Sequence, residues 1–251
     1  MPHIDLNCDL GESFGAYTIG MDEKVIPFIT SANVACGFHA GDPLVMQRTV
    51  ALCKQSSAAV GAHPGFPDLQ GFGRRQMKLT TAEAKACVQY QIGALKAFCD
   101  AAGVPLHHVK PHGALYNMAG KDRALADAIC AAVKESAPGA VLLALSGSEM
   151  VKAAQAIGLP VANEVFADRG YRPDGSLVPR GTPGAMIEDE DEAIARVIRM
   201  VTEGKVTAND GTDIAIQADS VCVHGDGPKA LAFVEKIGAA LQAAGVELKA
   251  F

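Results

Sequence analysis

Short apolar segments of strand length alternate with longer alanine-rich segments along almost the whole chain. This alternation constrains the fold more than any other feature, because repeated strand and helix units build a parallel sheet covered by helices. The strand-like segments are Ile4 to Leu10, Ala32 to Gly37, Ala58 to His63, His107 to Pro111, Ala140 to Ser146, Pro160 to Phe166 and Ser220 to Gly225. Since an α/β barrel commonly uses about 250 residues as one unit, we predict a single (β/α)-barrel domain over residues 1–251, with about seven strands.

The segments between the strands carry apolar residues at every third or fourth position, which is the spacing of amphipathic helices. They are Asp42 to Ser57, Thr80 to Ala102, Asp122 to Glu135, Ser148 to Ile157, Asp189 to Thr202 and Pro228 to Ala244. Thr80 and Glu83 have the spacing of a capping box. Asn209 to Ile216 predicts a small hairpin. Pro64 to Lys78 and Ala167 to Ile187 are rich in Gly, Pro and Arg, and we predict long functional loops there.

The chain carries 22 Lys and Arg against 28 Asp and Glu, which gives a formal net charge of −6. A chain of this charge lacks the excess of basic residues that binds nucleic acid or an anionic membrane, so its expected partners are proteins and small molecules. The seven cysteines form no CxxC pair and are predicted to be reduced thiols. The N-terminal segment lacks a secretory pattern and no stretch of about 20 apolar residues follows. We therefore expect a cytoplasmic protein.

Polar residues occupy one face of most predicted strands, because side chains alternate between the two faces of a strand. This polar set is Asp5, Asn7, Asp9, His39, His63, Lys110, His112 and His224. If the apolar face packs on the helices, the polar face points into the barrel, where each unpaired charge costs several kcal/mol. Most of the set lies at the carboxyl ends of the strands, where barrel enzymes keep their sites. The pattern predicts a polar ligand cavity. The alternative is a structural network in which these polar side chains only hydrogen-bond to one another.

Further charged residues stand close to these strand ends. Glu12 adds a second carboxylate just beyond Asp9, and two acids of different burial can divide the roles of acid and base. The two long loops contain Arg74, Arg75 and Arg169, and an arginine fork suits a carboxylate or a phosphate.

Several familiar catalytic motifs are absent from the sequence. There is no G-x-x-x-x-G-K-[ST], no G-x-G-x-x-G after the first strand, no G-x-S-x-G and no H-E-x-x-H. P-loop, Rossmann, nucleophile-elbow and zincin enzymes are therefore disfavoured. Cys36 and Cys222 are the candidate nucleophiles, but their positions within strands favour inert buried thiols.

Six motifs occur in a characteristic order along the chain: DLNCDLGE from Asp5, ACGFHAGDP from Ala35, GAHPG from Gly61, KPHGALY from Lys110, FADR from Phe166 and VHGD from Val223. Together they resemble the LamB/YcsF family over nearly the whole length. The resemblance implies a distorted seven-stranded parallel (β/α) barrel, similar to the polysaccharide-deacetylase type. It also implies ATP-dependent opening of the lactam ring of 5-oxoproline to L-glutamate, together with two partner subunits, B and C.

The resemblance and the polar strand faces together give the candidate site. The catalytic candidates are Asp9, Glu12, His39, Lys110 and His112, and the substrate-binding candidates are Asn7, His63, Arg74, Arg75, Glu164, Arg169 and His224. In the wider deacetylase superfamily an Asp and two His hold a divalent metal, and the positions similar to that trio are Asp9, His39 and His63. ATP with Mg²⁺ would bind mainly to the partner subunits, because this chain has no phosphate-binding loop. The alternatives are a stand-alone metal-dependent amidohydrolase or carbohydrate deacetylase, and a non-catalytic binding or scaffold barrel.

Overall fold

The computed structural model describes residues 2–223 and 230–251. Parallel strands form a closed barrel in the order β1 (His3–Leu10), β2 (Ser31–Ala35), β3 (Ala59–His63), β4 (Leu106–Val109), β5 (Val141–Leu145), β6 (Val161–Phe166) and β9 (Ser220–Val223). Each strand pairs with the next, and β9 closes the ring by pairing with both β6 and β1. The predicted seven-stranded barrel is confirmed.

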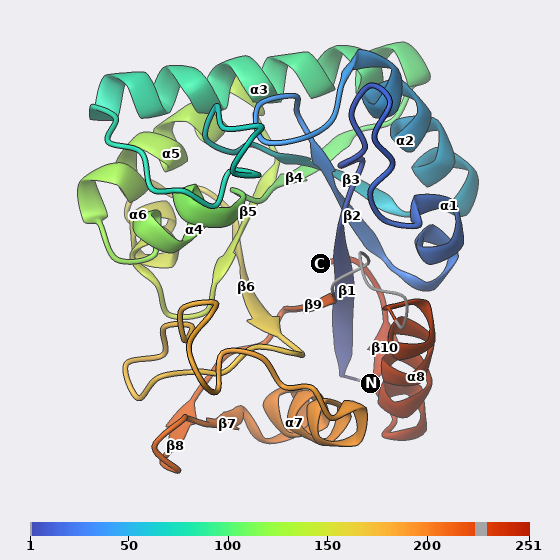
Figure 1. The fold of residues 1–251 in the computed structure, drawn as a ribbon, viewed down its shortest axis with the longest axis vertical. Helices are drawn as coiled ribbons and strands as arrows, with labels where there is room; N and C mark the ends of the chain where they lie inside the picture. The colour runs from blue at the N-terminus through green and yellow to red at the C-terminus, as the bar shows by residue number, and fades with distance from the viewer. Residues whose placement is uncertain (1, 224–229) are drawn as a thin grey trace.

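Helices surround this barrel on the outside (Figure 1). The six predicted helices are all present, as α2 (Pro43–Ser56), α3 (Thr81–Ala102), α5 (Arg123–Ser136), α6 (Glu149–Ala156), α7 (Glu190–Glu203) and α8 (Ala230–Ala243). No helix in the described part of the chain combines the length and the apolar character needed to cross a membrane.

Side-chain caps fix where several of these helices begin. Thr80 and Glu83 form the predicted capping box at the start of α3. Asp42 and Asp122 accept hydrogen bonds from amides in the first turns of α2 and α5, at 2.9 and 3.1 Å. These bonds satisfy amides that have no partner inside the helix. Ser148 stands in the same position before α6, but its side chain makes no cap hydrogen bond.

The structure also contains elements that the sequence pattern did not predict. They are α1 (Asp22–Val25), the 3-10 helix Ile26–Phe28, α4 (Gly113–Ala119) and the short strand β10 (Glu247–Leu248), which pairs with β1. The predicted hairpin is present as β7 (Lys205–Thr207) and β8 (Asp213–Ala215), so its first strand lies before the predicted range.

Two predicted strands end two residues earlier than expected. β2 ends at Ala35, before Gly37 adopts a positive φ of 89°. β4 ends at Val109, just before Lys110 and Pro111. A proline has no amide hydrogen to continue the strand ladder. Lys110 and His112 therefore leave the strand and lie at the entrance of α4, where they reach the cavity from a turn.

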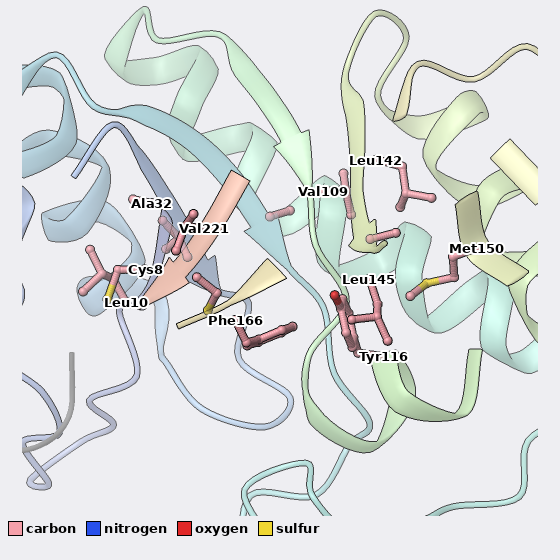
Figure 2. Packing of buried hydrophobic residues seen from close by; sticks show 14 of the residues in the cluster. Cys8, Leu10, Ala32, Val109, Tyr116, Leu142, Leu145, Met150, Phe166 and Val221 are labelled. Carbon is pink, nitrogen blue, oxygen red and sulfur yellow. The ribbon is translucent and has the colours of Figure 1, made fainter. Parts of the chain in front are cut away.

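Alternation along β1 separates the apolar layer from the barrel interior. Leu6 and Cys8 are fully buried in the hydrophobic core, while Asn7 is fully buried on the opposite face and accepts a hydrogen bond from Asn33. Figure 2 shows Cys8, Leu10, Ala32 and Val221 gathered beside neighbouring strands. The predicted division of this strand into two faces is confirmed.

The interior of the barrel remains polar below the strand ends. Ser31 donates a hydrogen bond of 2.6 Å to Asp5, and Thr30 and Ser220 also donate to this carboxylate. Burial raises the pKa of Asp5, although these hydroxyl groups oppose the shift. Asn33 accepts a hydrogen bond from His108 Nε2 at 2.8 Å. Polar side chains therefore satisfy one another through the barrel interior, as buried polar groups require.

Gly61 shows how tightly this interior is packed. A Cβ atom at Gly61 would overlap the imidazole of the fully buried His108. We expect Gly61→Ala to lower the free energy of unfolding by about 1–3 kcal/mol, the usual cost of overpacking. Gly93→Ala in α3 is the matched control, because its Cβ would meet no described atom within 4 Å; it should raise the free energy of unfolding by about 0.5–1 kcal/mol. Urea denaturation of both variants tests this, and equal stabilities would contradict it.

Candidate active site

A cavity of about 830 Å³ lies at the carboxyl ends of the barrel strands. Its inner half is lined by side chains from the strand ends and the turns after them, namely Asp9, Glu12, His63, Phe72, Lys110, His112, Tyr116 and Phe166. Its outer half is lined by the turn between α4 and α5, the start of α6 and residues 172–180. The predicted location of the cavity agrees with this geometry.

Lys110 stands among acidic groups in the inner half. Its Nζ atom lies 3.0 Å from Asp9 Oδ1 and 2.6 Å from Glu164 Oε1. It also donates a hydrogen bond of 3.2 Å to Asn7 Oδ1. Lys110 is 2% exposed and Glu164 is fully buried. The lysine charge is therefore matched by two carboxylates inside the barrel, which compensates for the cost of burying it.

The charges of Lys110 and Asp9 stabilise each other. Burial opposes the charge of Lys110, but nearby anionic groups, Asp9 first, outweigh burial and hold the pKa of Lys110 well above its usual range. Burial likewise opposes ionisation of Asp9, but His63 and Lys110 outweigh it and hold the pKa of that carboxyl well below its usual range. At neutral pH, Lys110 is a fixed cation and Asp9 a fixed anion, so both are better electrostatic groups than proton carriers.

Tyr116 completes this group from outside the strands. Its hydroxyl donates a hydrogen bond of 2.6 Å to Glu164 Oε2, while the other carboxylate oxygen pairs with Lys110. Figure 2 shows Tyr116 close to Leu145 and Phe166. Tyr116 lies in the unpredicted helix α4, so the strand pattern gave no signal for this contact.

A second group consists of Glu12, His39, His63 and His112, all buried, whose ligand-type atoms lie within 4.8 Å of one another. Glu12 Oε1 lies 3.3 Å from His39 Nε2 and 3.8 Å from His112 Nδ1. The rings of His39 and His112 stack with a centroid distance of 3.6 Å. Asp9 lies beside this group, 3.3 Å from His63 Nε2.

Backbone carbonyls fix the tautomers of two of these histidines. His63 Nδ1 lies 2.7 Å from the carbonyl oxygen of Lys110, and His112 Nε2 lies 2.8 Å from that of Phe72. Carbonyl oxygens only accept hydrogen bonds, so both of these nitrogens carry hydrogen. The remaining nitrogens, His63 Nε2 and His112 Nδ1, face each other at 2.9 Å. In the neutral rings these are two lone pairs, which repel unless a proton or a metal ion lies between them.

The environment favours neutral rings at His39 and His112. Burial, followed by the charge of His63, lowers the pKa of His112 to about 3. Burial, followed by the charge of His112, holds the pKa of His39 well below its usual range. These two rings are therefore neutral at neutral pH, the form of histidine that binds a metal ion.

The two candidate thiols have the opposite character. Burial raises the pKa of Cys36 to about 12 and that of Cys222 well above its usual range. A thiol that does not ionise is a weak nucleophile. The interpretation of both as inert buried thiols agrees with these surroundings.

Comparison with known proteins identifies the family. Residues 4–251 match the LamB/YcsF family. The chain belongs to the LamB/YcsF family. A relative from Clostridium beijerinckii, named as the A subunit of 5-oxoprolinase, is 63% identical over 248 residues, which cover 99% of this chain and 97% of that protein. A protein of the same name from Bacillus subtilis is 57% identical over 250 residues, covering 100% of this chain and 97% of that protein.

Solved structures of similar proteins agree with this LamB/YcsF fold. The lactam utilization protein from Thermus thermophilus superimposes with a TM-score of 0.94 at 51% identity, covering 99% of this chain and 100% of that one. A family 4 carbohydrate esterase from Streptomyces lividans superimposes with a TM-score of 0.53 at 12% identity, covering 98% of this chain and 91% of that one. The second likeness shows that the barrel is of the deacetylase type.

The predicted arginines of this LamB/YcsF chain lie in different surroundings. Arg74 lines the cavity and its guanidinium lies 5.0 Å from the ring centre of Phe72. Arg75 is not among the residues that line the cavity and instead pairs with Asp68. Arg169 lines the cavity but donates hydrogen bonds to the backbone carbonyls of Ala185 and Val178. Arg169 therefore holds the loop in place, and Arg74 is the better-placed substrate contact.

The structure places the other predicted residues as follows. The contacts described above bring together eight of them: Asp9, Glu12, His39, His63, Lys110, His112, Asn7 and Glu164. His224 lies outside the described residues. Phe72, Asn33 and Tyr116 belong to the site but were not predicted, because their roles depend on a carbonyl or on contacts with distant strands.

The histidine group has the donor set of a divalent metal site. Neutral imidazoles and a carboxylate are the ligands that zinc accepts, and ligating histidines usually donate their other N–H to a carbonyl, as His63 and His112 do. The superfamily resemblance predicted Asp9, His39 and His63. Within the described residues, the group whose ligand atoms converge is Glu12, His39, His63 and His112, and Asp9 Oδ2 lies beside it, 3.3 Å from His63 Nε2. Asp9 is engaged by Lys110 and by Asn33 Nδ2 at 2.9 Å.

Proposed function

We propose that this chain is the ring-opening subunit of a 5-oxoprolinase, which adds water across the lactam C–N bond of 5-oxoproline to give L-glutamate. The observation that carries this proposal is the pairing of a fixed lysine cation with the group of Glu12 and neutral histidines in one cavity. The names of the relatives from Clostridium beijerinckii and Bacillus subtilis support it.

Lactam hydrolysis needs a base for water, stabilisation of the oxyanion and a proton for the leaving nitrogen. Glu12 takes a proton as the water oxygen bonds to the carbonyl carbon, and returns it to the ring nitrogen as the C–N bond breaks. His39 Nε2 lies 3.3 Å from Glu12 Oε1 and orients this carboxylate. The charge of Lys110 stabilises the oxyanion. Arg74 binds the substrate carboxylate.

The proposal includes ATP and two partner subunits, B and C. Because the sequence has no G-x-x-x-x-G-K-[ST] loop, the partners bind ATP with Mg²⁺ and phosphorylate the lactam oxygen, which makes the ring a better electrophile. This chain then receives the activated ring: water adds to the phosphate-bearing carbon, the C–N bond breaks to leave γ-glutamyl phosphate, and a second water releases inorganic phosphate to give L-glutamate. A cytoplasmic location is part of the same proposal and is supported by seven free cysteines.

The histidine group would hold a divalent ion through His39, His63 and His112, with Glu12 beside it. Such an ion supplies Lewis-acid polarisation of a carbonyl or a more acidic water. This metal-type donor set also favours a second candidate function, a stand-alone metal-dependent amidohydrolase or deacetylase. The two functions differ in whether the chain needs partners to act.

Reconstitution tests the proposal. The isolated chain with 5-oxoproline and ATP should form no glutamate, and addition of both partner subunits should produce glutamate and ADP together. Glu12→Gln should lower glutamate formation by about 10²–10⁴-fold, the usual contribution of a positioned base. Glu135→Gln, on the exposed surface of α5, is the matched control and should retain full activity. Robust ring opening by the isolated chain would contradict the division of labour, and full activity of Glu12→Gln would make the barrel a scaffold.

A further inference from the structure

We propose that the outer half of the cavity is a phosphoryl subsite, formed by Lys121, Ser148, Lys152, Arg172 and the first turn of α6. The inference rests on the proposed function, because the phosphoryl group it binds is that of the O-phosphorylated lactam. 5-Oxoproline is far smaller than the drug-sized ligands that fill pockets of about 300–1,000 Å³, so a cavity of about 830 Å³ has room for a larger ligand.

The charge of the cavity lining differs from that of the whole chain. The chain has a formal net charge of −6, but the cavity lining contains more Lys and Arg residues than Asp and Glu residues. Arg169 and Arg180 both line the cavity, and burial together with the neighbouring charge of Arg180 lowers the pKa of Arg169 to about 10.

The acidic residues of the outer half already have partners. Asp122 caps α5, and Asp174 accepts hydrogen bonds from Ser176 and lies 3.9 Å from Lys121. Glu149 lies 2.8 Å from Lys152. Arg172, which is half-buried, has no side-chain hydrogen bond or ion pair within residues 2–223 and 230–251. Although its charge acts on Asp174, its guanidinium N–H donors are available to a ligand.

Ser148 supplies a second observation that points to a ligand. It lines the cavity and is 7% exposed, yet its hydroxyl has no hydrogen-bond partner among the described residues. A serine before a helix normally caps the first turn, but Ser148 makes no cap bond. Apart from the amide of Glu149, which bonds to the carbonyl of Gly120, the first turn of α6 therefore keeps amides without a side-chain cap, and such amides favour an anion such as phosphate. A small rotation of the Ser148 side chain would add its hydroxyl to them.

Three separate elements meet at this subsite. The amide of Glu149 donates a hydrogen bond of 3.0 Å to the carbonyl of Gly120, which joins α6 to the turn after α4. The contact between Lys121 and Asp174 joins that turn to the loop of residues 172–180. Donors that line one cavity from three elements suit a tetrahedral dianion better than a planar carboxylate, which a single arginine fork satisfies.

Titration of the full chain with inorganic phosphate, followed by ³¹P NMR line broadening and by calorimetry, tests the subsite. Ser148→Ala and Arg172→Gln should each weaken phosphate binding by about three- to tenfold, the range expected for one lost charge-assisted hydrogen bond. Lys96→Gln, on the exposed surface of α3, removes the same charge elsewhere and should have no effect. Thermal unfolding without phosphate shows whether each variant remains folded.

The outcomes separate the subsite from the proposed reaction. Phosphate binding that the two variants weaken and the control preserves supports the subsite, even if reconstituted ring opening fails. Absence of phosphate binding, or equal binding by all variants, overturns it, even if ring opening succeeds. A parallel titration with ATP identifies the molecule whose phosphoryl group the subsite binds. If ATP binds no more tightly than phosphate, the phosphorylated lactam is supported as the ligand. If ATP binds more tightly through the same residues, the subsite is assigned to a nucleotide.

Discussion

Replacement of Lys110 by methionine is expected to abolish ring opening in the reconstituted complex and to destabilise the isolated chain. Methionine keeps the length of the side chain but leaves the fully buried Glu164 and the partly buried Asp9 without their cation. Removal of one partner of a buried ion pair costs about 3–5 kcal/mol of stability. Loss of an oxyanion-stabilising group costs about 10²–10³-fold in rate.

A double variant separates these two effects. The double variant Lys110→Met/Glu164→Gln removes one of the two carboxylate charges that lose their cation. The free energy of unfolding of the double variant should therefore recover in part. Its activity should remain as low as that of the single variant, because the cation is still absent. Recovery of activity together with stability would contradict a direct role for Lys110, since the lysine would then serve only to neutralise Glu164.

The pH dependence of stability follows from the same pair. The pKa of Asp9 is lowered on folding, so its contribution to stability is present above its unfolded pKa of about 3.9 and is lost as the pH falls through the folded value. The pKa of Lys110 is raised, so its contribution is complete below its unfolded pKa of about 10.4 and is lost as the pH rises through the folded value. Urea denaturation from acid to alkaline pH should show that the advantage of the unchanged chain over Lys110→Met is greatest between these limits.

The second prediction with a large effect concerns metal binding. The isolated chain, stripped of metal and then titrated with Co²⁺ at neutral pH, should bind one ion and develop the absorption of a histidine-bound cobalt site. His63→Ala or His112→Ala should abolish this spectrum, because their free lone pairs converge at 2.9 Å. Asp9→Asn should retain it, because Glu12 supplies the carboxylate of the converging group, while Lys110 and Asn33 hold Oδ1 of Asp9. Affinity should fall on acidification as the histidines become protonated.

The Asp9→Asn variant decides between the two ligand sets. Retention of the cobalt spectrum supports the group of Glu12 and three histidines, and its loss supports the trio of Asp9, His39 and His63. A chain that binds no divalent ion by absorption or elemental analysis would leave a shared proton between His63 and His112 as the explanation of their contact. This test does not depend on ring opening, so it holds for either proposed function.

Much of the fold follows from local sequence pattern. The alternation of apolar and polar residues along β1 places Asn7 inside the barrel and Leu6 outside it, and the helix caps at Asp42 and Thr80 lie where the sequence predicts them. These features depend on residues within a few positions of each other, because strand alternation and helix capping are local geometry. The location of a polar cavity at the strand ends follows from the same pattern.

The pairing of residues inside that cavity was decided only by closure of the barrel. Lys110 meets Asp9 across 101 positions of sequence, and His112 meets His63 across 49. The carbonyl of Phe72 fixes the tautomer of His112, and the helix that carries Tyr116 brings its hydroxyl to Glu164. Residue type and spacing identify which side chains point into the barrel. Their partners depend on strand register and loop paths, because a pair forms only where two distant segments bring complementary atoms within hydrogen-bonding distance.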